Sequence, residues 1–310
     1  MSTTGRVAVV GTGGIGGGWA AYFLSRGFDV IATDPQPNAE HDLRRRVTLY
    51  WQALEELGLA PGASTDRLQF VPSIERAVES ANFVQESGPE RLGIKHDIYR
   101  RMSAAAPADT PLVSSSSFFL VSDLQRVAVR PERVVLGHPF NPPHLVPLVE
   151  VAGSPQTSEV AIHRVMEFYK YIGKKPVRLK REIFGHIANR LQTALWREAF
   201  HLIASGVASA EDVDTAMTEG PGMRGAVLGP CMVWHVSGGE GGIRSTVAHM
   251  GPPLKAMVNE LHTGDLTDDI FRKVIESTEA MVAGKDTDTL RRYRDDGLLK
   301  VAAAKMAISG

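Results

Sequence analysis

The fold is decided by the stretch Arg6-Val7-Ala8-Val9-Val10-Gly11-Thr12-Gly13-Gly14-Ile15-Gly16. A short β-branched run that ends in a glycine cluster is typical of a buried parallel strand followed by a tight turn. The residues from Trp19 to Ser25 continue as a helix, and a second apolar run from Asp29 to Thr33 closes before Pro35. This strand–helix–strand order predicts an α/β fold with a doubly wound, mostly parallel sheet.

The spacing of the glycines predicts a dinucleotide site of the Rossmann-like type. The first glycine permits the tight turn, the second lets backbone amides approach a pyrophosphate, and the third lets helix and strand pack closely. The start of the following helix would face the phosphates. We expect the cofactor to contact Gly11, Gly13, Gly14, Ile15 and Gly16. A glycine-rich turn that binds no ligand is the alternative.

An acidic residue at the end of the second strand indicates which dinucleotide binds. The carboxylate of Asp34 would accept hydrogen bonds from a ribose diol and would repel a 2′-phosphate. No arginine follows it, because the next residues are Pro35-Gln36-Pro37. We therefore predict NAD rather than NADP. Asp34 could alternatively cap a turn before Pro35.

The rest of the chain divides into two parts. Apolar positions between Glu40 and Leu59 recur at helical spacing and predict a long amphipathic helix. Further strands are expected at 68–70, 83–86, 112–114, 134–137, 148–151 and 176–179. From about Gly185 onward only helical periodicity remains. We predict an NAD-binding domain over residues 1–184 and an all-helical substrate and dimerisation domain over residues 185–310.

Composition excludes several classes of partner. The formal net charge is −1, with 34 Lys and Arg against 35 Asp and Glu, so no nucleic-acid partner is expected. The basic runs Arg44-Arg45-Arg46 and Lys174-Lys175 are interpreted as solvated surface, with an anionic ligand such as coenzyme A as the alternative. Because Cys231 is the single cysteine, an internal disulfide and a cysteine-based zinc site are excluded, and we expect no metal.

The sequence contains no signal for export or membrane insertion. Residues 1–5 lead directly into the first strand, and no apolar stretch approaches the ~20 residues that a spanning helix needs. We expect a cytoplasmic protein that does not bind membranes.

A histidine and a glutamate form the candidate catalytic pair. Val134 to Gly137 leads to His138-Pro139-Phe140-Asn141-Pro142, and Glu150 lies in the following apolar run. If the two strands are neighbours, the carboxylate would orient the imidazole and stabilise its charged form. The other ring nitrogen would then take a hydroxyl proton while a hydride leaves the same carbon. A satisfied loop histidine and a surface glutamate are the alternative.

Six motifs together resemble the L-3-hydroxyacyl-CoA dehydrogenase superfamily over nearly the whole chain. They are Gly11 to Gly16, Asn82-Phe83-Val84-Gln85-Glu86, Ser114 to Ser117, His138-Pro139-Phe140-Asn141-Pro142, Leu148-Val149-Glu150-Val151 and Ile187-Ala188-Asn189-Arg190. The resemblance implies that His138 is the base and Glu150 its partner. It also implies that Ser117 and Asn189 hold the reacting oxygen, that Glu90 and Lys95 contact the cofactor, and that the protein is a homodimer.

Within the superfamily the chain is most similar to the L-carnitine dehydrogenases. The motifs that carry this likeness are Gly17-Gly18-Trp19-Ala20-Ala21, residues 57–64, Gln85-Glu86-Ser87, Leu195-Trp196-Arg197-Glu198-Ala199 and residues 238–242. Gly222-Met223-Arg224 and Gly229-Pro230 also occur in L-gulonate 3-dehydrogenases, which are similar to λ-crystallin. Phe118-Phe119, His144 and Gly225 depart from the usual pattern. An L-gulonate 3-dehydrogenase, an L-3-hydroxyacyl-CoA dehydrogenase and an NAD-binding crystallin-like protein without activity remain alternatives.

The resemblance implies a substrate that is a small hydroxy acid, and the quaternary ammonium group of a carnitine-like substrate would need aromatic rings around it. Candidate aromatics are Phe118, Phe119, Phe140 and Trp234, although ordinary packing would also explain them. Arg224 could bind a carboxylate, because its guanidinium offers two parallel donors; a surface position is the alternative. Ser117 and Asn141 complete the expected substrate contacts.

Overall fold

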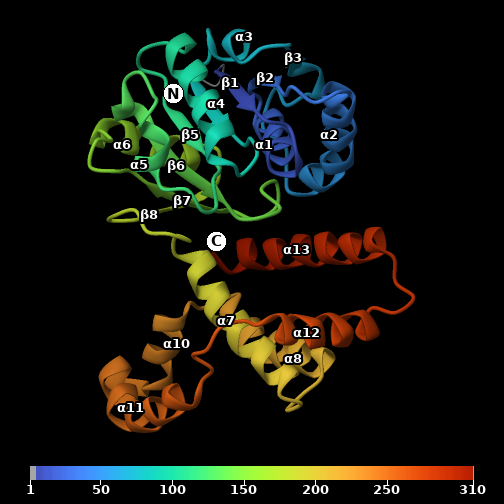
Figure 1. Ribbon diagram of the computed structural model, residues 1–310, viewed down its shortest axis with the longest axis vertical. Coiled ribbons are helices and arrows are strands. Elements are labelled where there is room, and N and C mark those ends of the chain that lie inside the picture. Colours follow the sequence, from blue (N-terminus) through green and yellow to red (C-terminus); the bar gives the residue numbers. More distant parts are fainter. Residues whose placement is uncertain (1–4, 310) are drawn as a thin grey trace. The chain divides into compact units, whose positions relative to one another are not determined.

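The strand order places the first strand inside the sheet, third from one edge. In the computed structural model, which describes residues 5–309, eight strands follow the order β3-β2-β1-β4-β5-β6-β7-β8 (Figure 1). Only the β6–β7 pair is antiparallel among these neighbours. The predicted mostly parallel sheet is therefore confirmed. The strands are β1 (Arg6–Val10), β2 (Asp29–Thr33), β3 (Leu68–Phe70), β4 (Phe83–Glu86), β5 (Leu112–Ser114), β6 (Val134–Pro139), β7 (Leu148–Ala152) and β8 (Lys175–Arg178).

Helices cover both faces of this sheet and form two separate cores with it. One face carries α1 (Gly14–Ser25), α2 (Ala39–Glu56) and α6 (Glu159–Tyr171). The other carries α3 (Ile74–Val78), α4 (Leu92–Ala105) and α5 (Val121–Gln125). Short 3-10 helices, η1 (Thr65–Arg67) and η2 (Pro131–Arg133), precede β3 and β6. Trp19 of α1 is fully buried and stacks on Phe23 and Tyr169, at ring-centroid distances of 5.2 and 5.6 Å.

Two predicted helix limits differ from the structure by a few residues. Helix α1 begins at Gly14 rather than near Trp19, because Gly16, Gly17 and Gly18 are buried in close contacts and this packing outweighs their low helix propensity. Helix α2 ends at Glu56 rather than Leu59, where Gly58 adopts a left-handed φ of 90° that a helix does not accommodate. The strand predicted at 176–179 is β8, displaced by one residue.

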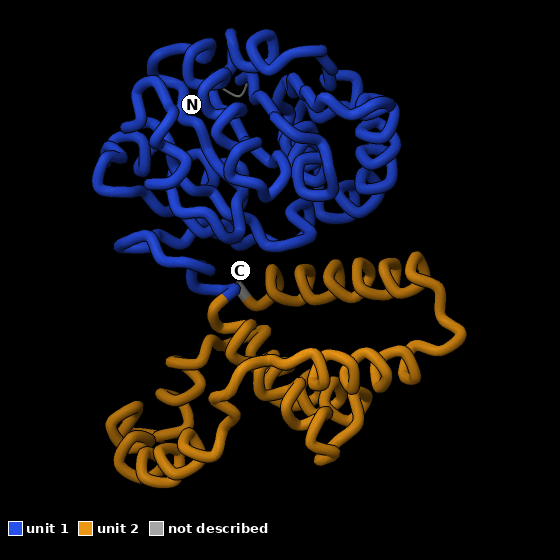
Figure 2. Tube along the Cα trace, viewed as in Figure 1, with its two compact units in different colours: residues 1–189 blue, residues 190–310 orange. Residues whose placement is uncertain are grey.

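The chain divides into two compact units, residues 1–189 and residues 190–310 (Figure 2). From Ala188 onward the described chain is helical, which confirms the predicted all-helical region. The elements are α7 (Ala188–Ala204), α8 (Ala210–Met217), η3 (Thr218–Gly222), α9 (Met223–Gly225), α10 (Pro230–Ser237), η4 (Gly239–Gly241), α11 (Gly242–Glu260), α12 (Asp268–Met281) and α13 (Thr287–Ser309). The domain boundary expected after residue 184 stays a prediction.

The two basic runs differ in their surroundings. Arg44 is solvent-exposed and pairs with Glu40 at 2.8 Å on the surface of α2, as interpreted from sequence. The same interpretation was wrong for Lys174, which is buried with only 3% of its surface exposed. No helix within residues 5–309 combines the length and the apolar character that crossing a membrane would require.

Candidate active site

The candidate site lies at the edge of the sheet where the parallel strands end. The chain runs outward from β1 through β2 to β3 and then returns to place β4 on the other side of β1. Such a reversal leaves a crevice at the carboxyl ends of the two central strands, which is where ligands bind in open α/β sheets. The glycine turn follows β1, and the turn after β4 meets it there.

Two glycines of this turn are required by close backbone contacts. Gly11 has a φ of 89°, and a Cβ there would lie 2.7 Å from the carbonyl oxygen of Ser87. A Cβ on Gly16 would lie 1.8 Å from the carbonyl oxygen of Gly11. Both contacts are far shorter than van der Waals distance. The first and third glycines therefore hold the strand–turn–helix junction together, as the sequence predicts.

The middle of the turn is open. A Cβ on Gly13 or Gly14 would meet no atom within 4 Å. The first turn of α1 carries no acidic residue, and no side chain caps its amides. Free amides at a helix start beside an uncovered backbone provide the donors and the space that a pyrophosphate needs. These residues therefore fit a dinucleotide.

Asp34 connects the ends of β1 and β2. One carboxylate oxygen accepts a hydrogen bond from the amide of Thr12 at 2.8 Å, and the other accepts from the amide of Gln36 at 3.0 Å. The second bond is the turn cap that the sequence left as an alternative. Because each carboxylate oxygen can accept a further donor, this geometry is compatible with ribose binding. The ribose contact stays a prediction.

The antiparallel β6–β7 pair places His138 directly opposite Glu150. Nδ1 of His138 lies 3.0 Å from Oε2 of Glu150, and the two side chains are 5% and 1% exposed. A carboxylate only accepts, so Nδ1 carries the proton and Nε2 of the neutral ring has a free lone pair. The Ser117 hydroxyl, 3.2 Å from Nε2, is then the donor of that hydrogen bond.

The second oxygen of Glu150 holds the start of helix α7. Oε1 accepts hydrogen bonds from the backbone amides of Ile187 at 2.7 Å and Ala188 at 3.0 Å. Burial alone would raise the pKa of Glu150, but the hydrogen bonds from His138 and from these two amides outweigh it and lower the pKa. Glu150 is therefore an anion at neutral pH, and its charge is available to an imidazolium on His138.

Glu90 organises residues 116–118, which we call the serine turn. Its Oε1 accepts from the Ser116 hydroxyl at 2.5 Å and from the amides of Ser117 and Phe118 at 2.9 and 3.0 Å. Burial tends to raise the pKa of Glu90, but the Ser116 hydrogen bond and the charge of Lys95 lower it below its usual value. Glu90 thereby fixes the turn that presents Ser117 to His138.

Lys95 lies behind Glu90 and is almost completely buried. Its ammonium is 2.9 Å from Glu86 Oε1 and 3.3 Å from Glu90 Oε2, and it donates to the carbonyl of Gly88 at 3.2 Å. The ammonium of Lys95 is therefore bound by groups of the protein itself. The cofactor contacts expected of Glu90 and Lys95 stay predictions.

The predicted substrate residues lie in different parts of the chain. Phe118 is 50% exposed and its ring is 5.9 Å from that of Phe184. Asn141 is exposed in the loop after β6, and Asn189 is partly buried in the first turn of α7. Arg224 on α9 and Trp234 on α10 belong to the second unit, and their place at the site stays a prediction. Of the other candidate aromatics, Phe119 packs against the core beneath α4 and α5.

Two buried side chains near the site were not identified from the sequence. The first is His186, whose ring centroid is 5.0 Å from that of His138. The second is Lys174, whose ammonium lies over the Tyr22 ring at 3.7 Å and donates to the carbonyls of Pro143 and Val146. Burial lowers the pKa of Lys174 well below its usual value. Lys174 thus fastens the loop between His138 and Glu150 to helix α1.

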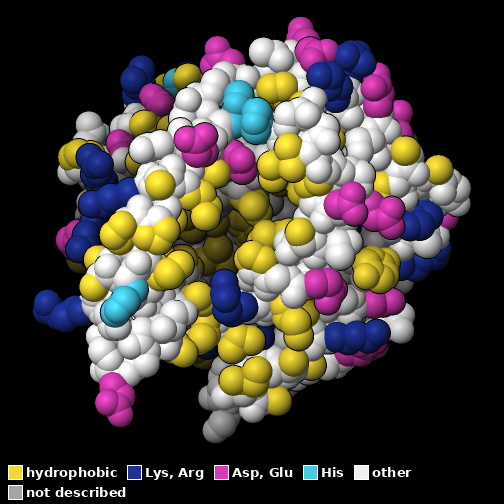
Figure 3. Space-filling view, turned by 90° about the horizontal axis from the view of Figure 1, so that it is seen from below, with side chains coloured by type: hydrophobic (Ala, Val, Ile, Leu, Met, Phe, Trp, Pro, Cys, Tyr) yellow, Lys and Arg dark blue, Asp and Glu magenta, His cyan; other side chains and the backbone are white. Residues whose placement is uncertain are grey.

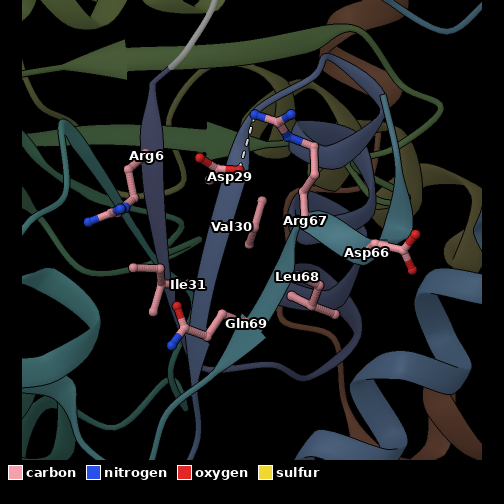
Figure 4. A pocket seen from close by; sticks show the side chains of 8 residues that line it. All are labelled: Arg6, Asp29, Val30, Ile31, Asp66, Arg67, Leu68 and Gln69. Atoms are coloured by element: carbon pink, nitrogen blue, oxygen red, sulfur yellow. Dashed lines mark ion pairs between the residues drawn. The ribbon is translucent and has the colours of Figure 1, made fainter. Parts of the chain in front are cut away.

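A second hollow lies where strands β1, β2 and β3 begin. Its lining includes Arg6, Asp29 and Arg67, and Arg67 pairs with Asp29 at 3.1 Å (Figure 4). The amino ends of parallel strands are not where ligands of such sheets bind. Because the glycine turn and the histidine pair are at the carboxyl ends, this hollow is not part of the candidate site.

Comparison with protein families agrees with this geometry. Residues 6–183 match the 3-hydroxyacyl-CoA dehydrogenase NAD-binding domain, and residues 185–284 match the C-terminal domain of the same enzymes. The predicted resemblance and the predicted cofactor, NAD, are confirmed.

Individual proteins are similar over almost the full chain. The L-carnitine dehydrogenase of Streptomyces griseus is 47% identical over 96% of this chain and 89% of its own. That of Pseudomonas putida is 44% identical over 96% and 92%. Among solved structures, a 5-formyl-3-hydroxy-2-methylpyridine 4-carboxylic acid 5-dehydrogenase, described as an NAD⁺-dependent dismutase, is 29% identical. It aligns with a TM-score of 0.83 over 98% of both chains.

Substitutions in the glycine turn should separate folding from cofactor binding. We expect Gly16→Ala to destabilise the protein by about 1–3 kcal/mol or more, because its methyl group overlaps the Gly11 carbonyl. Gly13→Ala should leave the melting temperature unchanged and weaken NAD binding roughly 10-fold or more, which is about 1.4 kcal/mol. Thermal unfolding and calorimetric titration with NAD measure the two effects. Unchanged NAD affinity in Gly13→Ala would contradict the placement of the pyrophosphate.

Proposed function

The chain belongs to the 3-hydroxyacyl-CoA dehydrogenase family, and on that premise we propose that it oxidises the 3-hydroxyl group of L-carnitine. It is an NAD-dependent dehydrogenase, similar to L-carnitine dehydrogenases at 44–47% identity over 96% of its length. The single observation that carries the proposal for the site is the buried His138–Glu150 pair, with Ser117 on the free nitrogen of the imidazole.

In the proposed reaction, Nε2 of His138 takes the proton of the substrate hydroxyl. Nδ1 keeps its proton and continues to donate it to Glu150 in a hydrogen bond, so the ring becomes an imidazolium whose charge the carboxylate stabilises. NAD, when bound, accepts the hydride from the carbon that bears the hydroxyl. The O–H and C–H bonds break, the carbon–oxygen double bond forms, and one proton remains on His138.

Ser117 is proposed to hold the reacting oxygen. Its hydroxyl already donates to Nε2 of His138, so a substrate hydroxyl that replaces this donor would lie within reach of both groups. Asn189 follows the two amides that bind Glu150 and is proposed to contact the same oxygen. Glu90 keeps Ser117 in place through three hydrogen bonds to the serine turn.

The choice of L-carnitine is supported by aromatic rings beside Ser117. Carnitine carries a trimethylammonium group on one side of its hydroxyl and a carboxylate on the other. Phe118 follows Ser117 in the chain and is half exposed, and its ring lies 5.9 Å from that of Phe184. A cation over the face of such a ring gains on the order of 0.5–2 kcal/mol. Arg224 is proposed to bind the carboxylate.

A panel of hydroxy acids tests this proposal. We expect the highest kcat/KM for L-carnitine among L-carnitine, L-gulonate, 3-hydroxybutyrate and its coenzyme A ester, measured by the ultraviolet absorbance of NADH. His138→Ala should lower kcat by about 10²- to 10⁴-fold with little change in KM, because general-base catalysis contributes that much.

Three results would contradict the proposal. A preference for the coenzyme A ester would favour an L-3-hydroxyacyl-CoA dehydrogenase whose α2 arginines bind the coenzyme A group. A preference for gulonate would favour an L-gulonate 3-dehydrogenase. NAD binding without turnover of any compound would favour a crystallin-like protein. Normal turnover by His138→Ala would remove the assignment of the base.

We further propose that the protein is a homodimer formed through the second unit. Among the described residues of that unit, Ala210 is the one buried hydrophobic side chain, whereas many apolar side chains of α7, α11 and α12 are exposed. Figure 3 shows many hydrophobic side chains on the face of the molecule that it draws. Apolar surface of this extent normally lies in an interface. A second copy of the chain would bury these exposed apolar side chains.

Light scattering tests this assembly. We expect the mass of two chains in solution, and we expect Met250→Lys on α11, which is 54% exposed, to produce monomers. Leu49→Lys on α2, at 73% exposure, is the matched control and should remain dimeric. A wild-type monomer at micromolar concentration would contradict the proposal.

A further inference from the structure

His186 is a second buried histidine beside the catalytic pair. Only 2% of its surface is exposed, and its ring is tilted by 50° to that of His138 at 5.0 Å between centroids. The reaction proposed above uses His138, Glu150 and Ser117 and assigns His186 no task. A polar ring buried this close to the reacting groups therefore calls for an explanation.

The backbone of His186 is in an unfavourable conformation. Its φ of 52° lies in the left-handed region, which few residues other than glycine adopt, although Asn, Asp and His do so more often than the rest. Gly185 before it also has a positive φ, of 76°. These two residues turn the chain so that the next two amides, of Ile187 and Ala188, both donate to Glu150. The strained turn thus delivers two donors to the acid of the catalytic pair.

The side chain of His186 reaches in the other direction, to the serine turn. Its Nε2 lies 3.1 Å from the carbonyl oxygen of Ser116. A carbonyl only accepts, so this nitrogen is the donor and the proton of the neutral ring is on Nε2. Ser116 precedes Ser117, whose hydroxyl contacts His138. The side chain of His186 is therefore bonded to the turn that carries Ser117, and its backbone directs the two following amides to Glu150.

The surroundings favour a neutral ring at this position. Burial lowers the pKa of His186, and the hydrogen bond to Ser116 offsets this only in part. The charged or titratable groups near it are His138, Glu150 and, on the far side of the serine turn, Glu90. If His186 stays neutral, the imidazolium charge that forms during the reaction is on His138.

We propose that His186 is a positioning residue of the dehydrogenase reaction, which fixes the serine turn and Glu150 relative to each other by its imidazole and its left-handed backbone. The inference rests on the proposed roles of His138, Glu150 and Ser117. A side chain that only filled space would not need the donor on Nε2. Left-handed strain at a non-glycine residue is expected where the side chain has a function.

Substitutions that keep either the aromatic ring or the hydrogen-bond donor of His186 distinguish the contribution of its shape from that of its hydrogen bond. His186→Phe preserves the aromatic shape and removes the donor. We expect kcat to fall on the order of 10-fold while the KM values for the hydroxy acid and for NAD stay unchanged. His186→Gln restores a donor near Nε2 and should recover kcat to within roughly 3-fold of the wild type. His186→Asn tolerates the left-handed backbone, but its side chain is too short to replace Nε2. Its kcat should therefore resemble that of His186→Phe, and it replaces that variant in the test if His186→Phe does not fold.

A matched control removes the same kind of bond elsewhere. Nε2 of His96 lies 2.8 Å from the carbonyl oxygen of Asp123 in a partly buried bond that involves neither the serine turn nor Glu150. His96→Phe should keep the wild-type kcat. A loss of kcat in this control equal to that in His186→Phe would overturn the proposal, since any buried imidazole–carbonyl bond would then have the same effect.

Hydrogen exchange provides a readout that does not depend on turnover. The amides of Ile187 and Ala188 should be protected in the wild type and exchange faster in His186→Phe, without a general loss of protection in the sheet. If no hydroxy acid is turned over, the proposed function fails, and this exchange pattern still decides whether His186 sets the turn. Wild-type kcat and wild-type exchange in His186→Phe, or an equal loss of kcat, substrate affinity and thermal stability in all variants, would overturn the proposal.

Discussion

The rest of the site depends on the hydrogen bonds that the carboxylate of Glu150 accepts. One oxygen holds the proton on Nδ1 of His138, and the other holds the first amides of α7. A buried anion is costly unless donors surround it, and here an imidazole and two amides supply them. The same carboxylate therefore sets the tautomer of the proposed base, His138, and holds the start of helix α7.

The sheet makes this contact possible, because β6 and β7 place the two residues directly opposite each other. Neighbouring strand ends bring the remaining parts to the same edge: the glycine turn after β1, Asp34 after β2, Glu90 after β4 and Ser117 after β5. Lys174 then secures the loop that joins β6 and β7. The reacting groups are thus held by regular strands and by short, well-bonded turns.

The sequence was sufficient for the fold and for the pairing of His138 with Glu150, because glycine spacing, strand alternation and motif order all report on local structure. Hydrogen bonds across long sequence separations were not predictable in this way. His186 meets Ser116 from 70 residues away, and its left-handed backbone leaves no pattern beyond the preceding glycine. Lys174 was misread because a pair of lysines normally indicates solvent, and burial over Tyr22 depends on the completed fold.

The tautomer of His138 is the most direct test of the central interaction. In protein with ¹⁵N-labelled histidines, long-range ring spectra report which nitrogen carries the proton, and His138→Gln identifies the signal. We expect the neutral ring of the wild type to carry its proton on Nδ1, and Glu150→Gln to reduce that preference. A proton on Nε2 in the wild type would contradict the assignment of His138 as a base held by Glu150.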